Sequence, residues 1–274
     1  MKLLNIGCGT TFHSAWVNID VEPVSRDIIQ HDAGTPLPFE ASSFDACYCS
    51  HILEHLSRDG ALLLLTEMRR VLKTGGIIRV VVPDLEGIVR TYLSSLEQTL
   101  SAKEGAEYPY DWIVLELLDQ MVRNTSGGRM EQFLKKCPAD ARDFILSRIG
   151  NEAVRFWGID QSKGSVLLRL ADKSAWWFFD KIRFWSICCF ARLLGGERGL
   201  RAVKEGWFRT SGEIHRWMYD RFSLRRLLQE AKFNDVVVCA PDASRIPGFE
   251  SYGLDVSNGA VRKPDSLFME GVRP

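Results

Sequence analysis

The sequence lacks several features that by themselves indicate a function. It has no uncharged apolar run of roughly 18 residues or more, so we expect no membrane-spanning helix. Its 35 basic and 35 acidic residues balance, which favours no polyanionic partner, and we expect no nucleic-acid binding. The seven cysteines include no CxxC pair, which disfavours a zinc ribbon or a disulfide framework. With no signal peptide ahead of the first predicted strand, we expect a cytoplasmic protein.

A short apolar segment that ends in glycines opens the chain. Residues 3–6 are predicted to form a buried strand, and Gly7-Cys8-Gly9 come directly after it. Closely spaced glycines let the backbone turn sharply and let a ligand approach, because no Cβ atom stands in the way. The same pattern is also typical of an ordinary strand and turn, so the glycines alone do not indicate a binding site.

An acidic residue, Asp20, ends the next predicted strand, residues 16–20. In dinucleotide-binding folds a carboxylate at this place accepts hydrogen bonds from ribose hydroxyls. Only eleven positions separate Gly9 from Asp20, where about twenty are usual, and Phe12 stands where a third glycine is expected. Both departures disfavour a nicotinamide cofactor and predict a first crossover that is reduced to a turn.

The first ninety residues alternate between predicted strands and crossovers. Further strands are expected at 27–32, 43–49 and 77–82, and a helix is expected from about residue 50 to a glycine stop at Gly75-Gly76. The last of these strands is almost entirely β-branched, as in a buried parallel sheet. The pattern predicts an α/β fold with helices on both faces of the sheet.

Four motifs follow one another in this half of the chain. They are Asn5-Ile6-Gly7-Cys8-Gly9, Leu37-Pro38-Phe39 with Ser43-Phe44-Asp45, the segment His51-Ile52-Leu53-Glu54-His55, and Arg70-Val71-Leu72-Lys73-Thr74-Gly75-Gly76. Together they resemble the class I S-adenosylmethionine-dependent methyltransferases, over residues 1–90 and again over 213–274. The short first crossover resembles a compact bacterial subgroup that is often associated with glycan biosynthesis. The resemblance implies a Rossmann-like seven-stranded sheet, with its last two strands antiparallel at the edge, and S-adenosylmethionine as the cofactor.

The resemblance also implies which residues meet the methionine half of the cofactor. The methionine end would pass Gly7-Cys8-Gly9, and the sulfonium would face the backbone of Ser50 and the side of His51. Asn5, which stands where many relatives carry an acid, is the candidate for the methionine amino group.

The nucleoside half of the cofactor is assigned in the same way. By resemblance, Asp20 and the adjacent Val21 would lie at the ribose, and Asp32 with the amide of Ala33 would read the adenine edge. The alternative for Asp20 and for Asp32 is that each caps a turn.

The segment His51–His55 also matches H-x-x-E-H, an inverted zinc-peptidase signature. The motif directly follows a predicted sheet strand, and it needs a further protein ligand that the sequence does not supply. We therefore expect no metal site, and we interpret His55 as a core or helix-start residue.

Residues 91–212 show no alternating strand pattern and are predicted to form a helical insertion. Because α/β folds place substrates in the loops after the strands, we expect this insertion to form a lid and an acceptor pocket. Aromatic and basic residues concentrate at 174–194. We favour an aromatic core or a dimer face for them, over peripheral contact with the inner membrane face or an anionic, lipid-linked acceptor.

Catalysis would need a base near the acceptor. Methyl transfer from a sulfonium is an in-line displacement that depends on positioning, but a sugar hydroxyl must also lose its proton. A histidine, with an ordinary pKa of about 6.5, suits this role at neutral pH. His215, where the lid rejoins the sheet, is the first candidate and His51 the second, with Asp220 or Glu213 orienting the base. The alternative is that His215 is a buried residue that holds the lid.

Three functions are compatible with these observations. The favoured one is an O-methyltransferase that acts on a hydroxyl of a saccharide or glycan intermediate, and here the acceptor class follows from the resemblance. The second is a methyltransferase for another small molecule or lipid. The third is a catalytically silent fold that serves as a binding partner in a biosynthetic complex, which the intact Gly7, Gly9, Asp20 and Asp32 disfavour.

Overall fold

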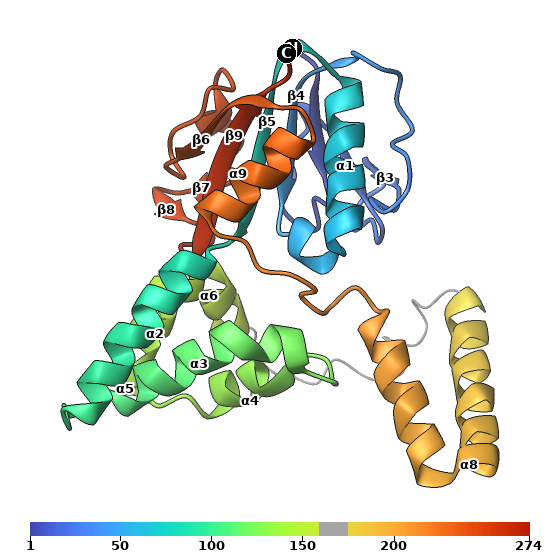
Figure 1. Cartoon of the computed structure of the whole chain (residues 1–274), viewed down its shortest axis with the longest axis vertical. Helices are drawn as coiled ribbons and strands as arrows, with labels where there is room; N and C mark the ends of the chain where they lie inside the picture. Colours follow the sequence, from blue (N-terminus) through green and yellow to red (C-terminus); the bar gives the residue numbers. More distant parts are fainter. Residues whose placement is uncertain (159–174) are drawn as a thin grey trace.

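A seven-stranded sheet joins the N-terminal and C-terminal parts of the chain. The computed structural model describes residues 1–158 and 175–274, with side chains of the second range from residue 179 onward. The strands are β1 (Leu3–Ile6), β2 (Trp16–Asp20), β3 (Ile28–Gln30), β4 (Phe44–Ser50), β5 (Leu72–Pro83), β6 (Asn234–Cys239) and β9 (Ser266–Val272). They lie in the order β3-β2-β1-β4-β5-β9-β6 (Figure 1). The strands from β1 to β5 pair in parallel, whereas β9 is antiparallel to both β5 and β6. The Rossmann-like sheet of seven strands is therefore confirmed.

The connection between β1 and β2 is short, as its length predicts. Residues 7–15 form turns and irregular backbone, and β1 and β2 lie side by side with Leu3 opposite Trp16. The third strand is shorter than expected, because it ends at Gln30 rather than at Asp32. Asp32 therefore lies in the loop after β3.

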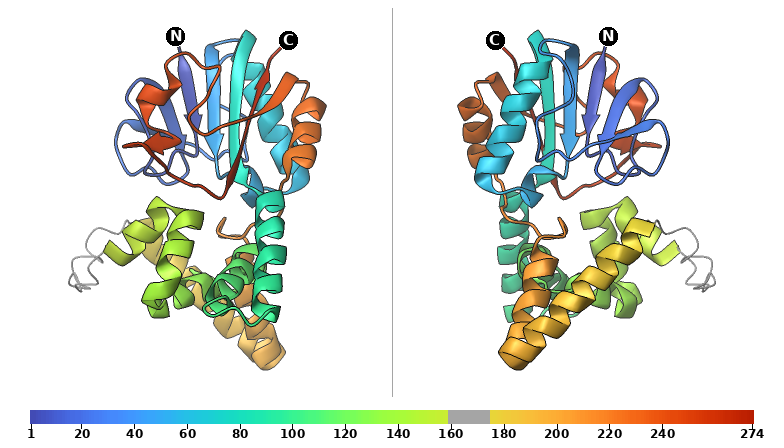
Figure 2. Two further views of the ribbon diagram at one scale, coloured as in Figure 1. Left: turned by 90° about the vertical axis from the view of Figure 1, so that its left-hand side faces the viewer. Right: turned by 90° about the vertical axis from the view of Figure 1, so that its right-hand side faces the viewer.

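The two faces of the sheet are covered differently (Figure 2). Helices α1 (Arg58–Val71) and α9 (Arg221–Glu230) supply apolar side chains to the core on one face. The other core includes Ile246, Phe249 and Leu254 from the loop between β6 and β9, which contains the short helix η2 (Phe249–Tyr252) and the hairpin β7 (Val256–Ser257) and β8 (Ala260–Val261). The expectation of helices on both faces is thus wrong, because the first crossover is too short to carry one and a C-terminal loop fills that space.

The helix expected from residue 50 is divided in two. A single turn, η1 (Leu53–His55), follows β4, and α1 begins only after Ser57, whose hydroxyl accepts a hydrogen bond from the amide of Gly60. The expected glycine stop at Gly75-Gly76 instead lies inside β5, which begins at Leu72 directly after α1. His51 consequently lies outside any helix.

The described part of the insertion is helical. Its elements are α2 (Leu85–Leu100), α3 (Glu107–Val122), α4 (Gly128–Lys136), α5 (Ala139–Ile149), α6 (Asn151–Gly158) and α8 (Ala175–Arg209). The expected boundary after residue 90 falls inside α2, a continuous helix that begins at the Asp84 cap. The insertion has its own core around Trp112, whose indole N–H donates to Glu116 Oε2 over 3.0 Å.

Helix α8 projects away from the rest of the molecule and turns back on itself at Gly196 (Figure 1). Phe184 and Trp207 pack between its two arms, with ring centroids 4.9 Å apart. Other apolar side chains of this helix are exposed, among them Trp185, Phe190, Leu193 and Leu194. The aromatic core expected here is therefore limited to part of α8, and residues 159–174 of the insertion lie outside the described ranges. Among the described helices, none has an apolar stretch long enough to cross a membrane.

Candidate functional site

A cavity of about 260 Å³ lies where β1, β4 and β5 end, at the edge of the sheet where α/β folds bind ligands. Six of the residues expected to meet the cofactor line it: Asn5, Gly7, Cys8, Gly9, Ser50 and His51. The insertion and the loop before β9 add charged residues that were not predicted from the sequence: Glu152, Arg155, Asp255, Arg262 and Lys263.

The glycine loop has the geometry of a ligand cradle. Gly7 and Gly9 have φ angles of 64° and 51°, in the left-handed region that favours glycine. A Cβ atom at Gly7 would lie 2.1 Å from Ile52 Cδ1, whereas a Cβ at Gly9 would meet nothing within 4 Å. The open space beside Gly9 and the polar cavity lining fit the methionine end of S-adenosylmethionine.

Asp20 is joined to this loop. Its Oδ2 accepts a hydrogen bond from the Gly9 amide over 2.7 Å, and its Oδ1 accepts one from the Glu22 amide over 2.9 Å. The carboxylate therefore fixes the glycine loop against the end of β2, as the turn-capping alternative expects. Val21 beside it is 57% exposed, and neither residue lines the cavity.

The expected adenine residues lie farther out. Asp32 is exposed, and its Oδ1 accepts a hydrogen bond from the Gly34 amide over 2.8 Å, while Ala33 is half-buried. Neither lines the cavity, so the structure gives Asp32 the turn contact that the alternative expects.

Asn5 and Cys8 are fixed by their surroundings. The Asn5 side-chain amide donates to Asn18 Oδ1 over 3.0 Å and to the Thr11 carbonyl over 3.2 Å, which ties β1 to β2 and to the crossover. Burial and the Asp20 charge raise the pKa of the Cys8 thiol to about 11. Cys8 is therefore a neutral wall residue rather than a nucleophile.

A second cavity, of about 650 Å³, lies between the sheet edge and the insertion. Its wall combines charged, amide and aromatic side chains, including Trp112, Gln120, Arg123, Phe156, Glu213, His215 and Asp265. The two cavities share His51, Glu152 and Lys263, and Lys263 Nζ lies 2.7 Å from Glu152 Oε1. The shared residues mark the junction of the two spaces.

His51 is held firmly at this junction. Its φ angle is 56°, and its amide donates to the Val81 carbonyl over 2.9 Å. On its ring, Nδ1 lies 3.0 Å from Glu54 Oε1 and Nε2 lies 2.9 Å from Ser266 Oγ. The backbone conformation and both ring contacts fix the direction of the imidazole.

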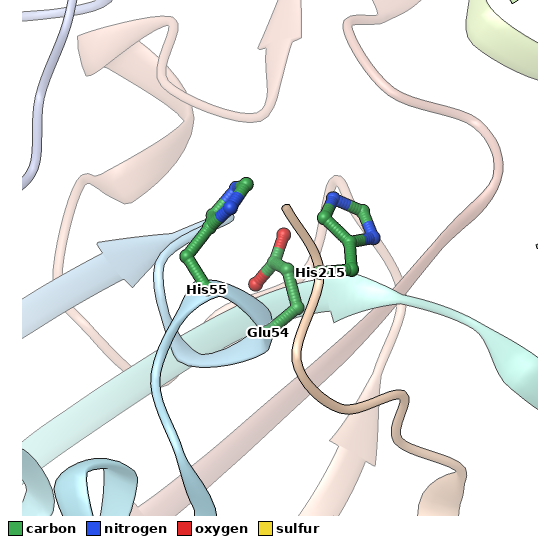
Figure 3. A group of neighbouring side chains, drawn as sticks. All are labelled: Glu54, His55 and His215. Carbon is green, nitrogen blue, oxygen red and sulfur yellow. The ribbon is translucent and has the colours of Figure 1, made fainter. Parts of the chain in front are cut away.

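Glu54, His55 and His215 come together beside the second cavity (Figure 3). The carboxylate of Glu54 lies beside both imidazoles, and the rings of His55 and His215 meet edge to face with centroids 4.8 Å apart. Glu54 is completely buried and His215 is 6% exposed. Burial would raise the pKa of Glu54, but the neighbouring histidines hold it below its ordinary value. Burial lowers the pKa of His215 to about 3, so this imidazole is neutral at physiological pH.

Two residues expected to orient the base have other partners. The Asp220 carboxylate caps α9 by accepting from the amides of Phe222 and Ser223. Glu213 Oε1 accepts from Arg123 Nη1 over 3.1 Å and from the Gly127 amide over 2.8 Å, which ties the chain before His215 to the insertion. The carboxylate that reaches the histidines is that of Glu54. Since His51 lies outside η1, the helical pair of an inverted zinc peptidase is not formed.

The family comparison agrees with this geometry. Residues 4–80 match the family model described as a methyltransferase domain. With the sheet order and the glycine loop, this match supports an S-adenosylmethionine-dependent methyltransferase domain in the cofactor-binding part of the chain. Among the curated proteins, none matches the chain.

Solved structures give more distant similarities. An S-adenosylmethionine-dependent methyltransferase of Archaeoglobus fulgidus is 12% identical over 99% of this chain and 86% of its own, with a TM-score of 0.36. A Thermotoga maritima methyltransferase, described as a possible histamine N-methyltransferase, is 13% identical over 100% of this chain and 82% of its own, with a TM-score of 0.36. The cyclase SpnF is 25% identical over 29% of this chain, with a TM-score of 0.24. The chain spans 38% of the length of SpnF and 47% to 54% of three other solved structures that it matches.

Proposed function

We propose that this protein transfers a methyl group from S-adenosylmethionine to a hydroxyl group of a saccharide or glycan intermediate. The observation that carries the proposal is the meeting of two cavities at His51, one beside the glycine loop and one beside the insertion. A methyl donor in the first cavity and an acceptor in the second would face each other at this junction. When bound, S-adenosylmethionine supplies an electrophilic methyl group on a sulfonium sulfur.

The lining of the second cavity supports a saccharide-like acceptor. A sugar presents hydroxyl groups at its edges and C–H groups on its faces, so it suits a pocket with both polar and aromatic walls. Gln120, Arg123 and Glu131 offer hydrogen-bonding groups, while Phe156 offers aromatic surface. The runner-up is another small molecule or a lipid, for which a more uniformly apolar wall is expected.

Geometry favours His51 over His215 as the base. His51 borders both cavities, whereas His215 borders only the second. The Glu54 carboxylate lies at Nδ1 of His51, which leaves Nε2 to take the proton of an acceptor hydroxyl that replaces Ser266 as its partner. This order reverses the one expected from the sequence.

A transfer assay with purified protein tests the proposal. Release of S-adenosylhomocysteine is measured with free, nucleotide-linked and lipid-linked sugars, and cofactor affinity is measured by calorimetry. We expect His51→Gln to lower kcat by roughly 10²–10⁴ while cofactor affinity changes less than about twofold. His31→Gln, at a histidine that borders neither cavity, is the control. Normal turnover of His51→Gln would exclude the base, and wild-type protein that binds no cofactor would favour the silent binding partner.

We also propose that α8 brings the enzyme to a membrane that carries a lipid-linked acceptor. The exposed Trp185, Phe190 and Leu194, together with Arg183 and Arg192 on the same helix, have the composition of an interfacial surface. The alternative is that a second copy of the chain covers this face.

A further inference from the structure

We infer that Glu54, His55 and His215 form a binding site for a divalent transition-metal cation in the wall of the acceptor cavity. This inference deepens the proposed function, because it names the group that would hold and activate the acceptor hydroxyl. From the sequence we expected no metal at His51–His55, because no further protein ligand was evident; His215 stands 160 positions along the chain from His55.

The first observation is a buried carboxylate that is only partly satisfied. Glu54 is 0% exposed, and its Oε1 lies 3.0 Å from His51 Nδ1. Within the described residues its Oε2 has no hydrogen-bond partner. Burying a carboxylate oxygen without a partner is costly, and coordination to a cation is one of the ways in which proteins offset that cost.

The second observation is the orientation of the imidazoles. His55 Nδ1 lies 3.3 Å from the Ile214 carbonyl, so the N–H at Nδ1 donates there and Nε2 keeps its lone pair. Metal-bound histidines usually show this arrangement, with one nitrogen on a carbonyl and the other on the ion. The His215 ring meets the His55 ring edge to face and lines the second cavity.

The third observation is the spacing of the donor atoms. One potential ligand atom from each of the three residues lies within 4.8 Å of the others. Ligand atoms of a tetrahedral site stand roughly 3.3 Å apart, because metal–nitrogen and metal–oxygen bonds are about 2.0–2.2 Å long. Small side-chain rotations close that difference. Two imidazoles and one carboxylate form the donor set of a catalytic zinc site, and this set also accepts Co²⁺ or Mn²⁺.

The backbone holds the ligands together before any ion binds. The Glu54 carbonyl accepts hydrogen bonds from the amides of Arg216 and Trp217, at 2.6 and 3.3 Å. The amide of His215 donates to the Gln120 carbonyl over 3.0 Å. The single turn η1 and the strand-like segment 214–217 are therefore clamped to each other and to α3.

The position of the cluster leaves a coordination site for the acceptor. His55 and His215 both line the second cavity, so the side of an ion that the three ligands leave open would face that space. An acceptor hydroxyl bound there would have a lower pKa. Its O–H bond would break, the proton would pass to His51 Nε2, and the electron pair would stay on the oxygen beside the cation.

Metal binding is measured on the whole chain without cofactor or acceptor. Absence of metal binding can then be distinguished from absence of methyl transfer. The probe is Co²⁺ added to chelator-treated protein, followed by its visible absorption and by calorimetry, with Mn²⁺ as a second probe. The background is Cys189→Ser, because the exposed thiol of Cys189 is a competing ligand. We expect one equivalent to bind with nitrogen and oxygen ligands, without the charge-transfer band of a cobalt thiolate.

Amino-acid substitutions test which side chains bind the ion. His215→Gln and Glu54→Gln should each weaken Co²⁺ binding at least tenfold, and the rise in Tm that Co²⁺ causes in the parent protein should disappear. His13→Gln and Glu97→Gln, which remove the same two side-chain types outside the second cavity, should bind as the parent does. A parent protein that binds neither ion, or a His215→Gln variant that binds Co²⁺ with parental affinity, would overturn the inference. In both cases the three residues would serve only to hold segment 214–217.

Discussion

Two groups of buried charged side chains differ in how completely their members are paired. Arg79, on β5, is 0% exposed and donates five hydrogen bonds: to Asp255, to Glu270 and to the carbonyls of Ala240, Pro241 and Ala243. Glu54, on η1, is equally buried, yet His51 at Oε1 is its one close partner among the described residues, and Oε2 has none.

This difference in pairing indicates that the Arg79 group and the Glu54 group have different roles. The Arg79 group connects β5 and β9 to the loop that covers one face of the sheet, and all five guanidinium N–H groups of Arg79 are used in hydrogen bonds. Asp255 also accepts from the Tyr48 hydroxyl over 2.5 Å, so the group continues into the apolar core. The Glu54 group has unused donor atoms and borders a cavity. We therefore expect the first group to determine stability and the second to determine activity.

The largest expected change in stability follows removal of Arg79. Arg79→Met leaves Asp255 buried without its counter-charge and leaves Glu270 with Arg245 alone, which should lower the free energy of unfolding by about 3–5 kcal/mol. Urea unfolding measures this change. Arg90→Met, at an exposed arginine that pairs with Glu86, should cost at most about 0.5 kcal/mol. Equal losses in the two variants would show that the buried network is not structural.

Glu54→Gln should lower activity strongly and stability little, in contrast to Arg79→Met. The neutral amide avoids the cost of a buried charge but loses the attraction to His51, so without added metal we expect the stability to change by at most about 1 kcal/mol. Turnover should fall roughly 10–100-fold. Unfolding curves and S-adenosylhomocysteine release measure the two effects. A stability loss as large as that of Arg79→Met would remove the contrast between the groups.

Asp265 should make the free energy of unfolding depend on pH. Burial, together with the Glu116 charge, raises its pKa from 3.8 to about 6. Between these values the native state holds the proton more tightly than the unfolded chain, so stability falls as pH rises through this window and is constant above it.

The matching variant is Asp265→Asn, which has no such titration. Relative to the variant, the wild type should lose roughly 1–3 kcal/mol between pH 4 and pH 7, since one pKa unit corresponds to about 1.4 kcal/mol. Unfolding free energies of both proteins across this range measure the effect. Parallel pH profiles would show that the pKa of Asp265 is not raised in the folded protein.

The smallest stability change is expected at α8. Trp185→Ser with Leu194→Ser alters side chains that are 73% and 83% exposed, so the unfolding free energy should change by less than about 0.5 kcal/mol. Flotation with anionic vesicles should nevertheless be lost. Leu100→Ser, at a 72% exposed position on α2, is the control. Unchanged flotation of the double variant would exclude α8 as the membrane surface, and a shift from dimer to monomer would favour the second copy instead.

Local patterns were enough to predict six residues that the structure brings to one cavity. The glycine loop, Ser50 and His51 come to one cavity because each directly follows a parallel strand, and such strands end at the same edge of the sheet. Lys263 and Glu152 could not be found in this way. They enter the site from a C-terminal loop and from α6, and no short sequence motif records that these two elements meet.

Apolar periodicity and glycine spacing were enough to predict the α/β class, the reduced first crossover and the helical nature of the described insertion, because these signals act over a few residues. The identity of the carboxylate that meets the histidines depended instead on tertiary contacts. Asp220 is five positions from His215 but its oxygens cap α9, whereas Glu54 is 161 positions away and lies beside both rings. Hydrogen bonds from the amides of Arg216 and Trp217 to the Glu54 carbonyl bring the two segments together, and such long-range pairing is not visible in the sequence of either segment.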